Sequence, residues 1–254
     1  MARACCLFRA GVAYGKDHFT KGLERCGYQL VAPQQNPAPG DVLLLWNRTP
    51  QFQAVAQRYE RAGAFVIVAE NGYVGRAPGG KLYALALGAH NGAGRWRCGG
   101  PERWQTQAID LQPWRQAGDH VLVLPQRGIG SPPAAMPYQW PTTTLNALQR
   151  ATARPVRLRR HPGAAKTEPY EDLRGAWVAI TWGSGAAVKA LVAGYPVFHD
   201  MPGWIAAPAA RQGITDIEHP HYGDREAMLA RLAWAQWSAA EIESGEAFSW
   251  LLER

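Results

Sequence analysis

Residues 177–197 read WVAITWGSGAAVKALVAGYPV, and this stretch decides the fold class. Its first part, Trp177–Thr181, is a continuous apolar run that predicts a strand buried on both faces. A glycine-bearing turn follows at Gly183–Gly185, and Ala186–Ala193 predicts a helix that ends at Gly194. Another short apolar strand comes next. Strand, turn, helix and strand in this order predict a βαβ unit with parallel strands.

The same rhythm continues on both sides of this stretch. Further strands are expected at Ala4–Phe8, Tyr28–Val31, Asp41–Trp46, Phe65–Ala69, His120–Leu124, Pro155–Arg160 and Pro196–His199. Further helices are expected at His18–Cys26, at Gln51–Arg61, at Thr142–Ala153 with Thr142 as N-cap, near Asp224, and at Ser238, where Ser238 and Glu241 form a capping box. Between the two blocks, Gly75–Arg115 is rich in Gly, Trp and Arg, without periodicity, and long loops of this kind tend to be functional.

Two successive βαβ blocks predict an α/β protein of two Rossmann-like domains, whose parallel sheets face a cleft. We expect an N-terminal domain at residues 1–118 and a C-terminal domain at residues 119–254, which includes the closing helices. A chain of 254 residues with 47% apolar content is long enough for two small domains.

The cysteines and the apolar runs bear on compartment and metal. The four cysteines are Cys5, Cys6, Cys26 and Cys98. They form no CxxC pair and no zinc spacing, so we predict no metal site and a reducing cytoplasm. The sequence shows no signal peptide and no apolar run of roughly 18 residues, so no membrane partner is expected.

The net charge of +7 is unevenly distributed along the sequence. Residues 1–118 hold 14 Lys and Arg against 7 Asp and Glu, and the rest holds 13 of each. An excess confined to one half suggests an anionic partner such as nucleic acid. The alternative is an ordinary basic surface, because no dense Lys/Arg run is present.

The turn at Ser184-Gly185 is the sharpest candidate site. A glycine-bearing turn at a helix N-terminus presents backbone N–H groups and a positive dipole end, and Ser184 adds a hydroxyl. Such a turn suits a diphosphate. Glycines also serve plain strand-to-helix turns, which is the structural alternative.

Arg160-His161-Pro162-Gly163 ends another predicted strand. Ligands bind at the carboxyl ends of parallel strands, so we expect His161 there, with Thr181 at the end of the neighbouring strand. The alternative is a structural histidine.

Arg127, Gly128 and Gly130 follow the strand His120–Leu124 and either wrap a phosphate or form a simple turn. No third glycine completes a dinucleotide fingerprint, and no Walker A loop is present. Ser184 is not in a GxSxG elbow, which argues against a Ser–His–Asp hydrolase.

Two residues of the first half are candidate general bases. Glu70 closes the strand Phe65–Ala69, and His90 lies in the glycine-rich loop Gly88–Gly94. Either accepts a proton from a hydroxyl if it lies near the cleft. The alternative for each is a turn or capping residue.

The C-terminal block resembles the donor half of GT-B glycosyltransferases, in particular the capsule-polysaccharide and Kdo-transferase-like groups. The shared features are a strand ending in His161-Pro162, a strand leading to Ser184-Gly185, and a helix ending in Gly194-Tyr195-Pro196-Val197. They cover about a third of the chain. The whole chain also looks like small phage-type proteins of this class.

This resemblance implies a nucleotide-sugar pocket between two domains, with a UDP-sugar as the expected donor and no metal. Residues 1–118 would be the acceptor-side domain, and residues 119–254 would be the nucleotide-sugar-binding domain. His161 would contact the donor phosphate or sugar, and Thr181, Ser184 and Gly185 would hold the diphosphate. Many of these families carry Glu, which holds the donor ribose, immediately before the Ala-Leu pair. Here the position is Lys189, which is either directed to phosphate or marks an altered site.

The predicted function is therefore transfer of a sugar from a nucleotide-sugar to a hydroxyl, with a hydroxymethylated base of DNA as the preferred acceptor. The alternatives are a glycan-directed transferase and a non-catalytic nucleotide- or DNA-binding module of the same fold.

Overall fold

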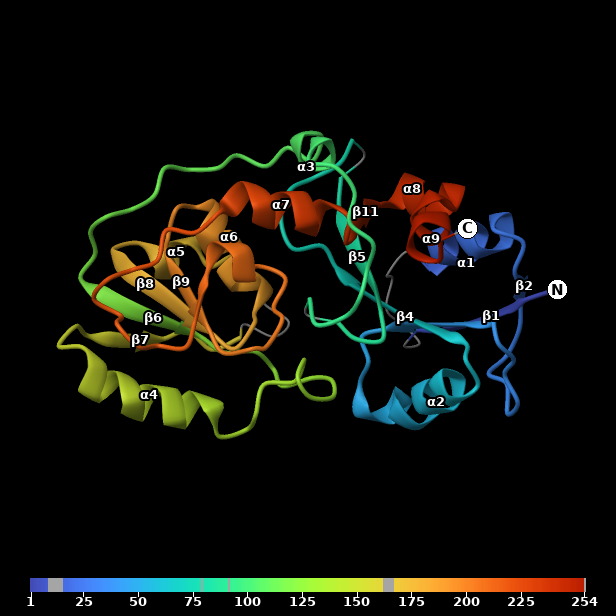
Figure 1. The fold of residues 1–254 in the computed structure, drawn as a ribbon, viewed down its shortest axis with the longest axis horizontal. Coiled ribbons are helices and arrows are strands. Elements are labelled where there is room, and N and C mark those ends of the chain that lie inside the picture. Colours follow the sequence, from blue (N-terminus) through green and yellow to red (C-terminus); the bar gives the residue numbers. More distant parts are fainter. Residues whose placement is uncertain (9–15, 79, 91, 162–166, 254) are drawn as a thin grey trace.

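The computed structural model describes residues 1–8, 16–78, 80–90, 92–161 and 167–253 of the chain. It has two β-sheets that lie side by side, each accompanied by helices (Figure 1). The strands are β1 (Arg3–Leu7), β2 (Gln29–Leu30), β3 (Val42–Trp46), β4 (Phe65–Asn71), β5 (Leu82–Leu87), β6 (His120–Leu124), β7 (Val156–Leu158), β8 (Ala176–Thr181), β9 (Val197–His199), β10 (Arg211–Gln212) and β11 (Gln236–Ser238). The helices are α1 (Lys16–Arg25), α2 (Pro50–Arg61), α3 (Glu102–Gln105), α4 (Trp140–Ala151), α5 (Tyr170–Leu173), α6 (Gly185–Val192), the 3₁₀ helix η2 (Ala207–Ala209), α7 (Arg225–Ala233), α8 (Ala239–Ser244) and α9 (Glu246–Leu251).

The second sheet is parallel throughout and has the order β10-β9-β8-β6-β7. Counted in chain order, its strands run 2-1-3-4-5, an order found in doubly wound α/β folds. The chain reverses its direction of sheet growth between β6 and β8. The carboxyl ends of β6 and β8 therefore flank a topological switch point, where such folds bind ligands.

The first sheet has the order β11-β5-β4-β3-β1-β2 and is mixed. Strands β1 to β4 are parallel, as expected, whereas β5 pairs with β4, and β11 with β5, in the antiparallel sense. The prediction of a purely parallel first sheet was wrong here. The sequence analysis assigned β5 to the irregular segment Gly75–Arg115, although LYALAL is apolar enough to pair with β4.

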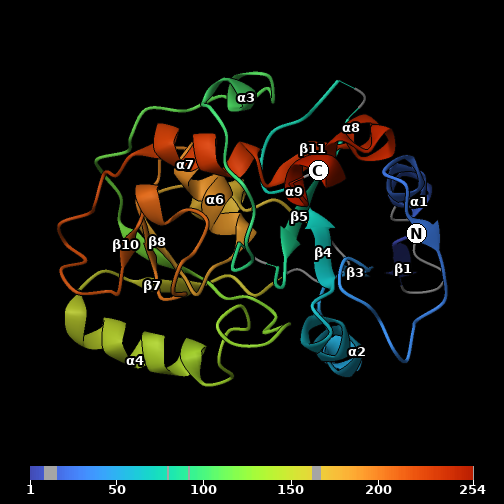
Figure 2. The same cartoon turned by 45° about the vertical axis from the view of Figure 1, so that its right-hand side comes forward.

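The end of the chain returns to the first sheet. Strand β11 extends that sheet beyond β5, and helices α8 and α9 lie beside α1 in both views (Figures 1 and 2). A Cβ on Gly22 of α1 would lie 1.9 Å from the carbonyl oxygen of Ile242 in α8, so the missing side chain permits this close approach. Of the two closing helices that we expected with the second half, α7 packs in the core that includes α6, whereas α8 joins the first half.

Two helix starts match the sequence and one does not. The Asp224 side chain accepts a hydrogen bond from Ala227 N at the start of α7, and the Ser238/Glu241 capping box is present at α8. Helix α4 begins at Trp140, with Gln139 as N-cap, so Thr142 lies inside the first turn and the prediction of Thr142 as N-cap was wrong. Pro at the second helical position is compatible with this earlier start.

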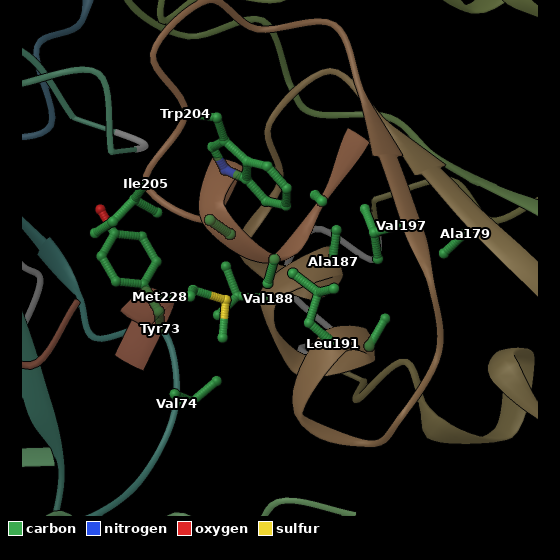
Figure 3. Packing of buried hydrophobic residues seen from close by; sticks show 14 of the residues in the cluster. Tyr73, Val74, Ala179, Ala187, Val188, Leu191, Val197, Trp204, Ile205 and Met228 are labelled. Atoms are coloured by element: carbon green, nitrogen blue, oxygen red, sulfur yellow. The ribbon is translucent and has the colours of Figure 1, made fainter. Parts of the chain in front are cut away.

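A shared apolar core joins the two halves. Tyr73 and Val74 follow β4 in the first half. They pack with three residues of the second half: Val188 of α6, Met228 of α7, and Ile205, which precedes η2 (Figure 3). Because burial of each such side chain contributes roughly 1.5–3 kcal/mol, this core holds the two sheets in a defined relative position.

Candidate functional site

The switch point is built from the ends of β6 and β8. Thr181, fully buried at the end of β8, donates its hydroxyl to the Leu124 carbonyl at the end of β6, at 2.8 Å. The sequence analysis put His161 on the strand next to Thr181. In the structure β6 lies between β7 and β8, so Leu124 is the neighbour of Thr181 and His161 lies one strand further away.

The start of α6 follows directly. Ser184 is the N-cap, and its Oγ accepts a hydrogen bond from Ala186 N at 3.2 Å. The expected phosphate donors were the amides of both Ser184 and Gly185. Ser184 N–H instead donates to Thr181 Oγ1 at 2.9 Å, whereas Gly185 N–H has no hydrogen-bond partner among the described residues. The helix thus offers the Gly185 amide and the Ser184 hydroxyl, at the positive end of its dipole.

Glu70 of the first half approaches this helix start through Tyr73. The Tyr73 hydroxyl donates to Glu70 Oε1 at 2.7 Å. The Tyr73 ring lies against the opposite half, because a Cβ on Gly185 would stand 3.7 Å from Tyr73 Cδ1. Burial, and then the Glu70 carboxylate, raise the pKa of Tyr73 well above its usual value, which keeps this hydroxyl a donor. A carboxylate and a helix N-terminus therefore face the same tyrosine.

The loop that follows β5 crosses to the second half. Gly92 has a φ of +72°, and a Cβ there would stand 2.5 Å from Ile205 Cβ, so only glycine allows this contact. His90 is 3% exposed and packs against Gly130, at 2.8 Å between His90 Cε1 and the Cβ position of Gly130. Burial first, and then the charges of Arg127 and Arg48, lower the pKa of His90 to about 4, although the hydrogen bond with the Ile129 backbone acts in the opposite direction. His90 is therefore neutral at pH 7, and its Nδ1 has no hydrogen-bond partner among the described residues.

Gln126, at the switch point, is a residue that the sequence reasoning missed. Both polar atoms of its side-chain amide are buried, and neither has a hydrogen-bond partner. An unpaired buried amide costs roughly 1–3 kcal/mol per group, so such a group is typical of a site that a ligand completes. Its place directly after the strand His120–Leu124 was the available signal.

Cations gather at the ends of β6 and β7. Arg127 is exposed. The pKa of His161 is lowered first by the partial burial of the imidazole and then by the charge of Arg127. The same guanidinium acts on His90, so Arg127 lies within electrostatic reach of both histidines. Arg160 is exposed beside His161, and Pro162 and Gly163 of the predicted motif lie outside the described residues.

Lys189 lies one turn after Gly185 in α6, and its ammonium forms an ion pair with Glu168 Oε2 at 2.5 Å. The lysine that was expected to be directed to phosphate is therefore paired with a carboxylate. Gly128 takes a φ of +66° and Gly130 a φ of +112°, so both hold the loop after β6 in turns that other residues rarely adopt.

Two cavities lie elsewhere in the described chain. One, of about 320 Å³, is lined by Glu60, Phe65, Arg95 and Leu252 among others, and the second, of about 670 Å³, lies at the amino end of β6 beside Asp119 and Arg154. Neither is lined by a residue of the predicted site. Within the described ranges no three His, Cys, Asp or Glu side chains gather as metal ligands, and no described helix has the length and apolarity of a membrane span.

Comparison with known proteins gives structural but not sequence matches. No family model matches the chain, and no curated protein is significantly similar to it. Two solved structures of Thermosulfurimonas dismutans KpsC are similar in fold. The β-Kdo 2,4-transferase aligns with a TM-score of 0.58 at 12% identity, over 91% of this chain and 90% of that one. The β-Kdo 2,7-transferase aligns with a TM-score of 0.55 at 12% identity, over the whole of both chains. At this identity the likeness shows that the chain has a glycosyltransferase-like fold.

Proposed function

We propose that this chain is a glycosyltransferase that moves a sugar from a nucleotide-sugar to a hydroxyl group of a glycan. The observation that carries the proposal is the start of α6 at the switch point, where Gly185 lies beside Tyr73 of the other half, whose hydroxyl donates to Glu70. In this arrangement each parallel set of strands is the centre of a Rossmann-like domain. Residues 1–118 serve the acceptor, and residues 119–254 serve the donor, apart from their closing elements.

The donor phosphate would lie at Ser184 and Gly185, where the Gly185 amide and the Ser184 hydroxyl are the available donors at the N-terminus of the helix. Arg127 and His161 would add positive charge or hydrogen bonds on the other side of the switch point. These groups favour the negative charge that develops on the leaving phosphate, which is the largest contribution that a site of this kind makes to catalysis. We propose a UDP-sugar as donor and catalysis without a metal.

Glu70 would act as general base. As the acceptor oxygen bonds to the anomeric carbon, the bond from that carbon to the donor phosphate oxygen breaks. The phosphate oxygen keeps the electron pair, and Glu70 Oε takes the acceptor proton. His90, neutral and with Nδ1 unpaired, would accept a hydrogen bond from a substrate hydroxyl.

Charge no longer favours DNA as the acceptor. The excess of +7 in residues 1–118 was the reason to expect DNA, but residues 236–253 fold back onto the first half. Residues 1–118 with 236–254 hold 15 Lys and Arg against 11 Asp and Glu, and residues 119–235 hold 12 against 9. Net charges of +4 and +3 no longer single out one half for a polyanion. Both structural neighbours are Kdo transferases, which favours a glycan.

The direct test incubates the purified chain with panels of UDP- and CMP-sugars and one of two acceptor classes. These are oligosaccharides, including Kdo-terminated ones, and DNA with hydroxymethylated bases, and a reaction without acceptor is the control. We expect nucleotide release that depends on one donor and on a glycan. Release that depends on the modified DNA would support the DNA prediction instead. Release no greater than background with every pair would refute the proposed function.

A further inference from the structure

Tyr73 touches three parts of the molecule that the proposed reaction has to align. Its hydroxyl donates to Glu70 Oε1 at 2.7 Å and also receives the Gly92 backbone amide. Its ring lies beside the start of α6 at Gly185 and among the apolar side chains of Ile205 and Met228 (Figure 3). The end of β4, the loop that carries His90, and the proposed phosphate end of α6 therefore meet at one side chain.

The backbone at Tyr73 is also fixed. Gln236 of β11 is fully buried, and its amide oxygen accepts from Tyr73 N at 3.0 Å while its nitrogen donates to the Val74 carbonyl at 2.7 Å. Gln107 Oε1 accepts a second hydrogen bond from the same nitrogen, at 2.8 Å. Two backbone groups and two side-chain amides thus hold the segment after β4, so the ring of Tyr73, which is 7% exposed, has little freedom to move.

We propose that Tyr73 is a positioning residue, whose hydroxyl orients the Glu70 carboxylate toward an acceptor hydroxyl next to the start of α6. This inference rests on the proposed function. A carboxylate on a flexible side chain loses rotational freedom when a fixed donor holds one oxygen, so the Tyr73 hydroxyl limits the orientations that Glu70 can adopt. The hydroxyl of Tyr73 is satisfied as donor and as acceptor, so it holds Glu70 rather than the substrate.

The test is a double-mutant cycle of Tyr73→Phe and Glu70→Gln, measured as kcat and donor KM for the donor and acceptor found active with the unchanged chain. Phe keeps the ring in the shared core, so the fold is retained. We expect Tyr73→Phe to lower kcat about 10- to 100-fold, with donor KM changed less than about threefold. In the Glu70→Gln background the same change should lower kcat less than about twofold, because Tyr73 acts through Glu70.

The matched control is Tyr59→Phe. Tyr59 of α2 is also a buried tyrosine, and its hydroxyl accepts a hydrogen bond from Gln34 N at 3.2 Å. Its loss should lower thermal stability as much as the loss of the Tyr73 hydroxyl does, with kcat unchanged.

The outcomes separate the two proposals. If the unchanged chain transfers no sugar, the proposed function fails. If the unchanged chain is active and Tyr73→Phe keeps its kcat, or lowers it equally with and without Glu70, the positioning role is overturned.

Discussion

At the scale of single residues, two side chains near the glycine loop after β6 carry buried polar atoms that no hydrogen bond satisfies. His90 Nδ1 and both amide atoms of Gln126 have no partner among the described residues. A folded chain pairs most of its buried polar groups, since each unpaired one costs roughly 1–3 kcal/mol. Thr49 Oγ1 and His120 Nε2 are also buried without a partner among the described residues, so His90 and Gln126 are candidate ligand contacts because of their place at the switch point.

Burial of His90 makes stability depend on pH. Its pKa is lowered to about 4, while in the unfolded chain it returns to about 6.5, so the unfolded state binds a proton first as the pH falls. Stability is therefore lost between about pH 6.5 and pH 4, and by about pH 5 the loss is roughly 2 kcal/mol. We predict that the free energy of unfolding drops by about that much more in the unchanged chain than in His90→Gln between about pH 7.5 and pH 5.

Chemical denaturation at the two pH values measures this difference. His161 and His199, whose pKa values burial also lowers, remain in both proteins and cancel in the comparison. Equal losses in the two proteins would contradict the burial of a neutral His90.

At the scale of elements, contact between α1 and α8 fixes the return of the chain. Gly22 lies inside α1, where replacement by Ala normally stabilises a helix by about 1 kcal/mol. Here the added methyl would meet the Ile242 carbonyl at 1.9 Å and the Phe248 ring at 2.9 Å. We predict that Gly22→Ala instead destabilises the chain by about 1–3 kcal/mol, measured by thermal or denaturant unfolding. Glu24→Ala, an exposed change in the same helix, should shift stability by less than about 0.5 kcal/mol. A stabilised Gly22→Ala variant would show that the two helices do not pack as described.

The elements that the sequence predicted share one property: a local pattern strong enough to specify them. Buried strands such as Val42–Trp46, His120–Leu124 and Ala176–Thr181 are continuous apolar runs, and the Ser238 capping box is readable from two residues. Strand β11 has only three residues and pairs with a strand more than a hundred residues earlier, so no local signal specifies it.

The candidate site was predictable to the same extent. The start of α6 and the residues Glu70, His90 and Arg127 were proposed from the sequence because they follow strands or glycine turns, and their roles stay predictions. Tyr73 and Gln126 were not, because their importance depends on what surrounds them: Tyr73 reads as part of a turn, and Gln126 as an ordinary polar loop residue. The pairing of Ser184 N–H with Thr181 likewise depends on the geometry of the turn.

At the scale of the whole molecule, the two halves are not independent in sequence. The apolar core of the first sheet takes Trp237, Ile242, Phe248 and Leu251 from the end of the chain. We predict that residues 1–118 alone lack a cooperative thermal transition, because β5 is then an open edge and this core is incomplete.

A fragment that joins residues 1–118 through a flexible Gly/Ser linker to residues 234–254 should regain a cooperative transition by circular dichroism. It is the matched control, since it restores β11, α8 and α9 without the second sheet. If residues 1–118 unfold cooperatively without the added segment, the C-terminal return is not needed for the fold of the first half.

The central claim is that the start of α6 binds the phosphate of a nucleotide-sugar, and titration calorimetry tests it on three proteins: the unchanged chain, Gly185→Ala and Gly185→Asp. A methyl at Gly185 makes only an ordinary contact of 3.7 Å with Tyr73, and an acidic side chain in the first turn is compatible with the helix dipole, so both variants should fold. We predict that a nucleoside diphosphate or its sugar conjugate binds the unchanged chain and Gly185→Ala with similar affinity, and Gly185→Asp at least about tenfold more weakly, because the new carboxylate repels the phosphate. No binding to the unchanged chain, or equal binding to all three proteins, would contradict the claim.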